Sequence, residues 1–231
     1  MLVRTIDQTV LPATLHNRIL RAICGLGPVN RYRFSIKVIS MLIDKSGFDP
    51  LLLERAASIR MLVLDVDGVL TDGSLYFDNN GNEMKAFSIR DGLGLRCLQL
   101  CGIELALITG RQSEIVDRRA EQLGIAHVYQ GRNDKLDAFI HLLEKTGIDE
   151  QQVCYAGDDW IDLPVLERVG LAVTVPEADK IVKDSVHWVT SHSGGKGAVR
   201  EICNLVLAAQ GLEKKVLDEI LKPNIAPGFK P

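Results

Sequence analysis

From residue 49 to residue 211 the chain alternates short apolar runs with amphipathic segments. Apolar runs of strand length predict strands buried on both faces; they lie at 59–66, 103–110, 126–131, 152–157 and 171–175. Segments with apolar residues at helical spacing predict helices at 49–58, 92–102, 113–124, 135–147, 162–170 and 198–211. This alternation predicts an α/β fold with a doubly wound, mostly parallel sheet covered by helices on both faces.

One segment breaks the alternation. Residues 73–90, GSLYFDNNGNEMKAFSIR, alternate apolar and polar positions on both sides of NNGN, which is a strong turn signal. The pattern predicts a β-hairpin inserted after the first strand. Its apolar positions have little core left to cover, so we expect them to contact another subunit; a simple extension of the sheet edge is the alternative.

The ends of the chain are less regular than its middle. We expect an N-terminal extension of unknown role over 1–49, one α/β domain over 50–210 and a C-terminal tail over 211–231. One hypothesis is that translation begins at Met41. The last residues, KPNIAPGFKP, hold three prolines and are expected to be extended.

Composition narrows the class of protein. The formal net charge is −3, which argues against a surface that coats nucleic acid. No apolar run approaches the ~20 residues that a membrane span needs. The five cysteines, an odd number without a C-x-x-C pair, indicate a reducing compartment and offer no zinc site. We therefore expect a cytoplasmic protein that binds neither nucleic acid nor membrane.

Polar residues gather where the predicted strands end. In parallel sheets, ligands bind outside the carboxyl ends of the strands, so segments distant in sequence meet there. The converging residues are Asp65 and Asp67 in LDVDGVLTDG, Thr109 and Gly110 in LITGR, Lys135 in GRNDK, and Asp158, Asp159 and Asp162 in GDDWID. Each motif is common by itself; their order on separate strand ends indicates one shared crevice.

The residue types in this crevice indicate phosphate chemistry. Clustered carboxylates without His or Cys favour Mg²⁺. We expect the side chains of Asp65 and Asp158 and the backbone carbonyl of Asp67 to be its ligands. Lys135 and the Thr109 hydroxyl would hold phosphate oxygens. The set predicts phosphoryl transfer, in which positioning and charge neutralisation do most of the catalysis.

Four motifs in this order resemble the haloacid dehalogenase superfamily of phosphohydrolases: DVDGVLT, LITG, Lys135 and GDDWID. The resemblance implies a catalytic set of Asp65, Asp67, Thr109 and Lys135. Asp65 would be the nucleophile that forms an aspartyl-phosphate, and Asp67 the general acid and base. Side chains two apart in an extended segment lie on one side, so both carboxylates can face one phosphate.

The spacing between motifs leaves no room for a cap domain. Asp65 and Thr109 are 44 positions apart, and Lys135 and Asp158 are 23 apart. The predicted hairpin, helices and strand occupy both gaps. A capless site is open to water and has few walls of its own with which to select a substrate, so we expect a neighbouring subunit to close it.

Longer stretches resemble 3-deoxy-D-manno-octulosonate 8-phosphate phosphatases, capless Mg²⁺-dependent homotetramers of lipopolysaccharide biosynthesis: DGVLTDGSLYFDNNGNEMKAFSIRDGLGL, TGRQSEIVDRRAEQLGI, YQGRNDKL, YAGDDWIDLPVL and GGKGAVREI. Guanidinium groups suit a substrate with a carboxylate and a phosphate. The resemblance implies substrate contacts from Asp67, Ser88, Ile89, Arg90, Asp91, Gly92, Arg96, Arg111, Arg119 and Lys135, with Arg118 competing for the role of Arg119.

Other functions stay open at this point. A related phosphatase of a nine-carbon keto acid phosphate has nearly the same motifs. A phosphotransferase would use the same residues with another acceptor than water. A non-catalytic partner with this fold would be expected to lose at least one motif residue, and all are present. The C-terminal tail reaching a neighbour's active site is a further hypothesis.

Overall fold

Six short parallel strands form the central sheet of the computed structural model, which describes residues 45–221. The strands are β1 (Met61–Leu64), β4 (Glu104–Ile108), β5 (His127–Tyr129), β6 (Val153–Ala156), β7 (Leu171–Thr174) and β8 (Trp188–Val189), in the order β5-β4-β1-β6-β7-β8. The five predicted strands are confirmed. The sequence did not predict β8, because a two-residue strand leaves too short a pattern.

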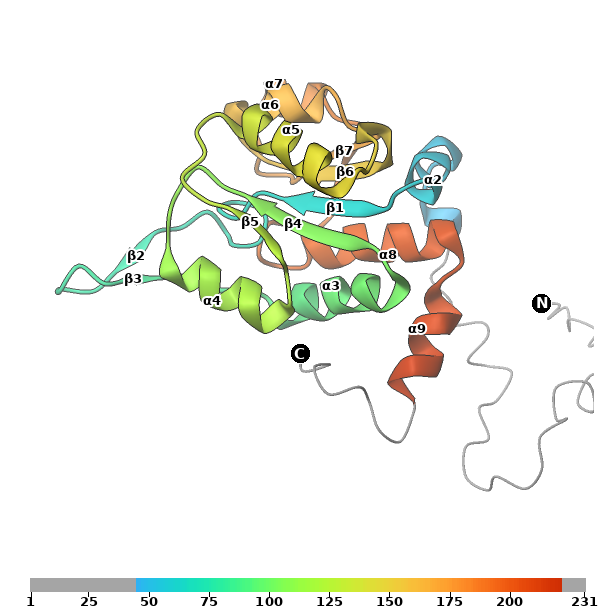
Figure 1. The fold of residues 1–231 in the computed structure, drawn as a ribbon, viewed down its shortest axis with the longest axis horizontal. Helices are drawn as coiled ribbons and strands as arrows, with labels where there is room; N and C mark the ends of the chain where they lie inside the picture. Colours follow the sequence, from blue (N-terminus) through green and yellow to red (C-terminus); the bar gives the residue numbers. More distant parts are fainter. Residues whose placement is uncertain (1–44, 222–231) are drawn as a thin grey trace, which may run out of the picture. The chain divides into compact units, whose positions relative to one another are not determined.

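Helices cover both faces of the sheet (Figure 1). Those of one layer are α2 (Pro50–Ala57), α3 (Ile89–Cys101), α4 (Glu114–Leu123), α8 (Ala198–Gln210) and α9 (Glu213–Ile220); those of the other are α5 (Lys135–Thr146), α6 (Leu163–Leu166) and α7 (Lys180–Asp184). Short 3₁₀ turns are η2 (Lys45–Gly47), η3 (Glu150–Gln152) and η4 (Trp160–Asp162). The predicted doubly wound α/β fold is confirmed.

The central strand β1 explains why its sequence is a continuous apolar run. Leu62 and Leu64 pack in the core with α3 and α8, while Met61 and Val63 pack in the core with α5 and α6. Successive side chains of a strand point to opposite faces, so a strand covered on both faces must be apolar at every position. All four residues of β1 are buried.

Two predicted helices have different bounds. The helix predicted at 92–102 begins at Ile89, because the Ser88 hydroxyl accepts a hydrogen bond from Asp91 N (3.3 Å) and caps it. The helix predicted at 162–170 is the short α6, which ends at Leu166.

The segment 211–231 holds the helix α9, which packs on α3 through the buried Val216. The division at 49 and 210 stays a prediction. The Met41 start and the prolines after residue 222 lie outside the described residues.

The predicted hairpin is present as β2 (Tyr76–Phe77) and β3 (Glu83–Met84), which pair antiparallel in a sheet of their own. Its strands are shorter than the pattern suggests. The Asp78 carboxylate holds the turn by accepting hydrogen bonds from the backbone N–H groups of Asn80 and Asn82 (both 2.8 Å). The hairpin projects from the end of the fold at which β1 ends (Figure 1).

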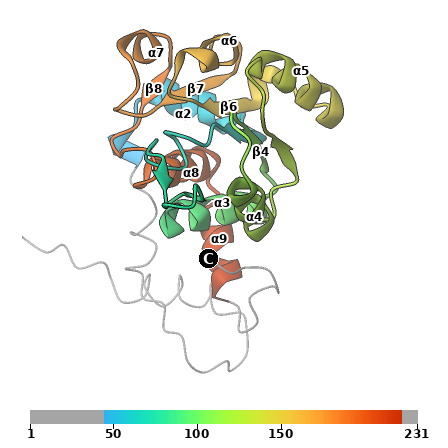
Figure 2. The ribbon, with the colours of Figure 1, turned by 90° about the vertical axis from the view of Figure 1, so that its left-hand side faces the viewer.

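The strand order places a topological switch point between β1 and β6. From β1 the chain runs outward through β4 to β5, and it then crosses to β6 on the other side of β1. Figure 2 shows the strands from the end that carries the hairpin. Within 45–221, the hairpin and α3 lie between β1 and β4, and α5 and η3 lie between β5 and β6. The expectation that these gaps hold no cap domain is confirmed.

Among the helices of residues 45–221, none has the length and apolar character to cross a membrane.

Candidate active site

Three carboxylates from two strand ends meet at the switch point. Asp65 directly follows β1 and is 5% exposed, and Asp158 and Asp162 follow β6. Each of the three offers an oxygen atom, and these oxygens all lie within 4.8 Å of one another. The neighbouring strands hold Asp65 in place, since its backbone N–H donates to the carbonyl of Ala156 (2.9 Å). The predicted convergence of these segments is confirmed for this cluster.

Asp162 holds the other groups of the cluster in place through its hydrogen bonds, and we call it the anchor for this reason. Its side chain is fully buried, and its Oδ1 accepts hydrogen bonds from Lys135 Nζ (2.7 Å) and from the Tyr155 hydroxyl (2.5 Å). Its Oδ2 accepts from the backbone N–H groups of Asp158 (3.2 Å) and Asp159 (3.1 Å). Both oxygens are therefore engaged, and we assign Asp162 the role of fixing Lys135 and the loop of Asp158 rather than that of a ligand.

Lys135 links the anchor to the predicted nucleophile. Its side chain is fully buried, and its Nζ lies 3.0 Å from Asp65 Oδ2. Burial alone would lower the pKa of Lys135, but the carboxylates of Asp65 and Asp162 outweigh burial and raise that pKa. The ammonium group is therefore charged throughout the physiological pH range. It can balance negative charge on Asp65 and on a phosphate beside it.

Burial perturbs the remaining two carboxylates strongly. Desolvation raises the pKa of Asp65 to about 7, with Lys135 opposing the shift and Asp162 adding to it. Desolvation likewise raises the pKa of Asp158 to about 7, and the charges of Asp65 and Asp162 add to it. Two acids with such raised pKa values side by side indicate a site with more buried negative charge than Lys135 alone balances.

The donor set fits a divalent cation that prefers oxygen. The buried atoms Asp65 Oδ1 and Asp158 Oδ1 have no hydrogen-bond partner within the described chain. Orphaned buried carboxylate oxygens are costly unless something neutralises them. Two such oxygens, without a nitrogen or sulfur ligand in the cluster, suit Mg²⁺ with its remaining positions filled by water and phosphate. The predicted ligands Asp65 and Asp158 thus lie together.

Glycines allow the loops around this cluster to approach closely. Gly68 has φ +97°, and a Cβ there would lie 2.0 Å from Asp158 Oδ2. Gly194 lies against the same loop, and a Cβ there would lie 1.8 Å from the Gly68 carbonyl oxygen. Only glycine fits at either position without displacing the Asp158 side chain or the backbone at Gly68.

Asp67 occupies the outer side of the site and contacts the hairpin. Its Oδ1 forms an ion pair with Lys85, and its Oδ2 lies 3.8 Å from Arg111 Nε. Glu83 joins the same group, since its carboxylate accepts from Arg111 Nη2 (3.1 Å) and from the Ser113 hydroxyl (2.8 Å). Burial opposes the ionisation of Glu83, but its hydrogen bond from Ser113 and the charge of Lys85 lower its pKa. The hairpin thus supplies charged groups to the site.

Two further predicted residues lie at or just after the end of β4, the strand next to β1. Thr109, at the end of β4, is 2% exposed, and its hydroxyl oxygen accepts from the backbone N–H of Arg111 (3.4 Å). The Arg111 side chain is about half exposed and pairs with Glu83 and Asp67. Both residues lie close to the end of β1, because β4 is its direct neighbour in the sheet.

The predicted substrate segment 88–92 forms the first turn of α3. Ser88 is its N-cap, and Ile89 and Arg90 are exposed. Gly92 and Asp91 are buried, and Asp91 Oδ1 accepts from the backbone N–H of Arg200 at the start of α8 (2.8 Å). Desolvation raises the pKa of Asp91. The structure therefore gives Asp91 a role in joining α3 to α8, and its direct contact with substrate stays a prediction.

The remaining arginines lie along α3 and α4. Arg96 donates to the carbonyl of Leu123 at the end of α4 (3.0 Å), which is a contact between the two helices rather than one with the acidic cluster. Arg119 lies over the Phe87 ring (5.7 Å to its centroid) beside the Ser88 carbonyl. Arg118 points into solvent and pairs with Glu114. Of the two competing arginines, Arg119 is the one beside segment 88–92.

Three residues of the site were missing from the sequence prediction. Tyr155 looked like a core residue of a strand, and its hydroxyl bond to Asp162 had no sequence signal. Glu83 and Lys85 looked like the exposed positions of a hairpin. Their opposite charges at i and i+2 would have been the available signal, since such residues share one side of a strand.

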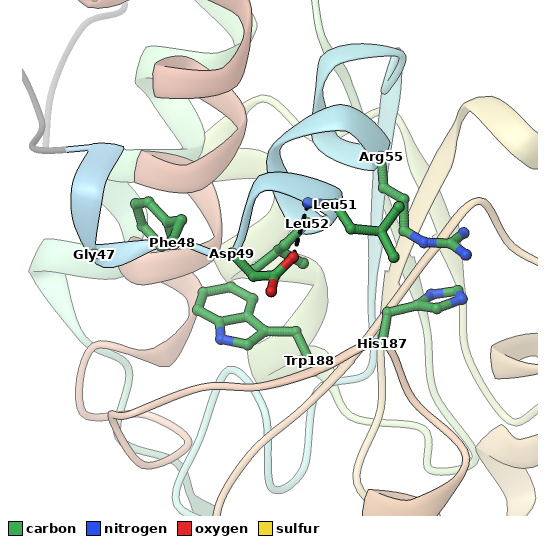
Figure 3. Close-up of a pocket in the computed structure, with 8 residues that line it drawn as sticks. All are labelled: Gly47, Phe48, Asp49, Leu51, Leu52, Arg55, His187 and Trp188. Carbon is green, nitrogen blue, oxygen red and sulfur yellow. Dashed lines mark hydrogen bonds between the residues drawn. The ribbon is translucent and has the colours of Figure 1, made fainter.

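A separate pocket lies beside β8, an edge strand of the sheet (Figure 3). It has a volume of about 430 Å³ and is lined by residues of η2, α2 and the start of β8. Its polar groups hold the fold: Asp49 caps α2, Arg55 Nη1 donates to the Gly170 carbonyl (3.0 Å), and His187 Nδ1 accepts from Ala172 N (2.9 Å). The acidic cluster, and not this pocket, has the chemistry of an active site.

Comparison with known proteins agrees with this geometry. The family model of haloacid dehalogenase-like hydrolases matches residues 116–202. Fold and site thus define a hydrolase of the haloacid dehalogenase type. The 3-deoxy-D-manno-octulosonate 8-phosphate phosphatase of Salmonella typhimurium is 52% identical over 162 residues, which cover 70% of this chain and 86% of the relative. The chain belongs to the family of 3-deoxy-D-manno-octulosonate 8-phosphate phosphatases.

Solved structures of this family are similar as well. The phosphatase of Yersinia pestis has a TM-score of 0.69 at 49% identity, over 70% of this chain and 88% of that chain. The phosphatase of Moraxella catarrhalis, in complex with a magnesium ion, a phosphate ion and a KDO molecule, has a TM-score of 0.71 at 41% identity, over 73% of this chain and 97% of that chain.

Proposed function

We propose that this protein is a magnesium-dependent phosphatase that hydrolyses 3-deoxy-D-manno-octulosonate 8-phosphate to 3-deoxy-D-manno-octulosonate (KDO) and phosphate. The observation that carries the proposal is the pair of buried, unpartnered oxygens of Asp65 and Asp158 beside the buried Lys135. Family membership gives the substrate. The reaction would serve lipopolysaccharide biosynthesis in the cytoplasm.

The first half of the reaction transfers the phosphoryl group to the protein. A carboxylate oxygen of Asp65 forms a bond to phosphorus, and the bond between phosphorus and the substrate's C8 oxygen breaks. Asp67 gives its proton to that oxygen, so that the sugar leaves as a neutral alcohol. The Lys135 ammonium and the Thr109 hydroxyl hold non-bridging oxygens, and Mg²⁺ bound by Asp65, Asp158 and the Asp67 carbonyl would neutralise their charge.

The second half restores the protein. Asp67, now a carboxylate, takes a proton from a water molecule, and the resulting hydroxide attacks phosphorus. The bond between phosphorus and Asp65 breaks, which releases phosphate and the free carboxylate. One side chain two residues from the nucleophile therefore serves as acid and then as base, because both proton transfers occur on the same side of the phosphorus.

Recognition of the sugar acid would come from the arginines at the open side of the site. Arg111 lies beside Asp67, and Arg119 lies beside Ser88 at the start of α3. Guanidinium groups bind carboxylates in a bidentate manner, which suits the C1 carboxylate of the substrate. We keep Ser88, Ile89, Arg90, Gly92 and Arg96 as proposed substrate contacts on the basis of the family resemblance.

The hairpin suggests how the open site is closed. Its outer positions are exposed apolar side chains, namely Leu75, Tyr76, Phe77 and Met84. We propose that they mediate self-association into a homotetramer. In sedimentation experiments, Phe77→Asp should shift the protein to smaller species, and an unchanged oligomeric state would contradict this assignment of the surface.

The experiment on function is a phosphate-release assay with Mg²⁺ against a panel of sugar phosphates, including the eight-carbon and nine-carbon keto acid phosphates. The eight-carbon substrate should have the highest kcat/KM. Asp65→Asn and a chelator should each abolish turnover, because the nucleophile or the charge neutralisation is lost. Preference for the nine-carbon substrate would replace the proposed substrate, and turnover by Asp65→Asn would refute the assigned nucleophile.

A further inference from the structure

We propose that Lys85, on the hairpin, is a positioning residue that holds one oxygen of the Asp67 carboxyl group, so that the other oxygen is oriented to give its proton to the leaving group. This inference rests on the proposed function, because it assigns Asp67 the role of general acid. It adds to the site a residue from outside the four sequence motifs. The hairpin then contributes a positioning residue to the active site in addition to its exposed apolar face.

The burial of Lys85 is the first observation. Its side chain is fully buried, although the large apolar side chains of the same hairpin are exposed. A buried ammonium group is costly unless carboxylates compensate it. Lys85 has two such partners, an ion pair with Asp67 Oδ1 and a second contact with Glu83 Oε1 at 3.4 Å. Its position is therefore determined by these two groups.

The geometry of β3, the second strand of the hairpin (its return strand), explains how the Lys85 side chain reaches the active site. Side chains alternate along β3, and Lys85 directly follows this strand, so Glu83 and Lys85 lie on one side and Met84 on the other. Met84 is 54% exposed, whereas the side chain of Glu83 is only 17% exposed and that of Lys85 is fully buried. The inner side of the strand thus faces the active site, and its outer side faces solvent.

The contacts of Asp67 show what Lys85 can do there. Lys85 engages Oδ1, whereas the contact of Oδ2 within residues 45–221 is the distant Arg111 Nε at 3.8 Å. Glu83 holds Arg111 in turn through Nη2 at 3.1 Å. One oxygen of Asp67 is therefore tethered, and the other remains available to give its proton to the leaving oxygen when the P–O bond breaks. Fixing the rotamer of a general acid lowers the cost of reaching this geometry.

The alternative is that Lys85 merely stabilises the hairpin. The two roles differ in their dependence on the leaving group. A sugar alkoxide is a poor leaving group and needs the proton of Asp67, whereas p-nitrophenolate leaves without one. Loss of a positioning residue should therefore slow the cleavage of a sugar phosphate much more than that of p-nitrophenyl phosphate. Loss of a structural contact should slow both by the same factor.

The test measures kcat/KM for both substrates, because this parameter reports the steps up to departure of the leaving group. For Lys85→Met we expect kcat/KM to decrease by about 10- to 100-fold with 3-deoxy-D-manno-octulosonate 8-phosphate, because part of the contribution of the general acid is lost. With p-nitrophenyl phosphate the decrease in kcat/KM should be less than about three-fold. Lys214→Met is the matched control, since it removes an exposed lysine that pairs with Asp218; both values should stay unchanged.

A second variant distinguishes loss of the Lys85 contact from a general disruption of the hairpin. Lys85→Gln keeps a polar donor and should reduce the ratio of the two kcat/KM values by a smaller factor than Lys85→Met. An equal decrease with both substrates in Lys85→Met, or a ratio in Lys85→Gln as low as that in Lys85→Met, would overturn the proposal. If the unmodified protein cleaves another sugar phosphate of the panel instead, the proposed substrate is wrong, and the same ratio measured with that sugar phosphate still decides the role of Lys85.

Discussion

The anchor role of Asp162 can be tested by removing its charge while keeping its shape. Asp162→Asn places one oxygen and one NH₂ group where two oxygens now accept four hydrogen bonds. Because an NH₂ group cannot accept hydrogen bonds, the bonds now accepted by one of the two oxygens are lost in either orientation of the amide. The buried Lys135 then keeps Asp65 as its remaining carboxylate partner.

The magnitude follows from burial and charge. Removing one partner of a buried ion pair typically costs about 3–5 kcal/mol. Asp162 also raises the pKa of Asp65 and of Asp158, so its neutralisation relieves some repulsion among the acids. We therefore expect the lower end, a loss of about 3 kcal/mol in the free energy of unfolding. For a chain of this size, that corresponds to a decrease of about 6–12 °C in Tm.

The assay is urea unfolding in the presence of a chelator, which keeps metal binding from contributing to the measured stability. The matched control is Asp184→Asn, which breaks the exposed pair with Lys180 and should leave the unfolding midpoint unchanged. A loss below about 1 kcal/mol in Asp162→Asn would refute the reasoning, because that is the contribution of an ordinary neutral hydrogen bond.

Three further predictions address the neighbouring residues. Tyr155→Phe should destabilise the protein by about 1.5 kcal/mol in the same assay, since it removes one donor to a charged acceptor; an unchanged midpoint would contradict the bond. Gly68→Ala should weaken Mg²⁺ binding by about ten-fold or more in calorimetry, because its Cβ would displace Asp158, whereas Gly81→Ala, with a similar positive φ but open space, should bind normally. Saturating Mg²⁺ should raise the Tm of the unmodified protein, and Asp158→Asn should lose this increase; a retained increase would exclude Asp158 as a ligand.

The sequence predicted the centre of the site because that centre depends on local rules. An apolar run that ends in an acidic residue marks the carboxyl end of a buried strand, and parallel strands bring such ends together. These rules were enough to place Asp65 and Asp158 in one site, and in the structure the strands before them, β1 and β6, are adjacent in the sheet. The doubly wound fold was predictable for the same reason.

The outer part of the site depends on contacts that no local pattern records. Lys85 looked exposed because nothing in the hairpin's own sequence says that it folds back onto Asp67. Asp162 was placed in the right loop, but only the contacts of both its oxygens distinguish an anchor from a ligand. The helix α9 was not among the predicted helices, although LEKKVLDEI has apolar residues at helical spacing in Leu212, Val216 and Ile220.

The alternation of the hairpin's return strand restricts how its length can change. Inserting or deleting a single residue before Glu83 would exchange the two sides of β3, so that Met84 would enter the charged crevice and both charged residues would turn to the solvent. The exposed apolar surface and the tether on Asp67 would be lost in the same event. Length variants of this loop that retain activity should therefore differ from one another by even numbers of residues.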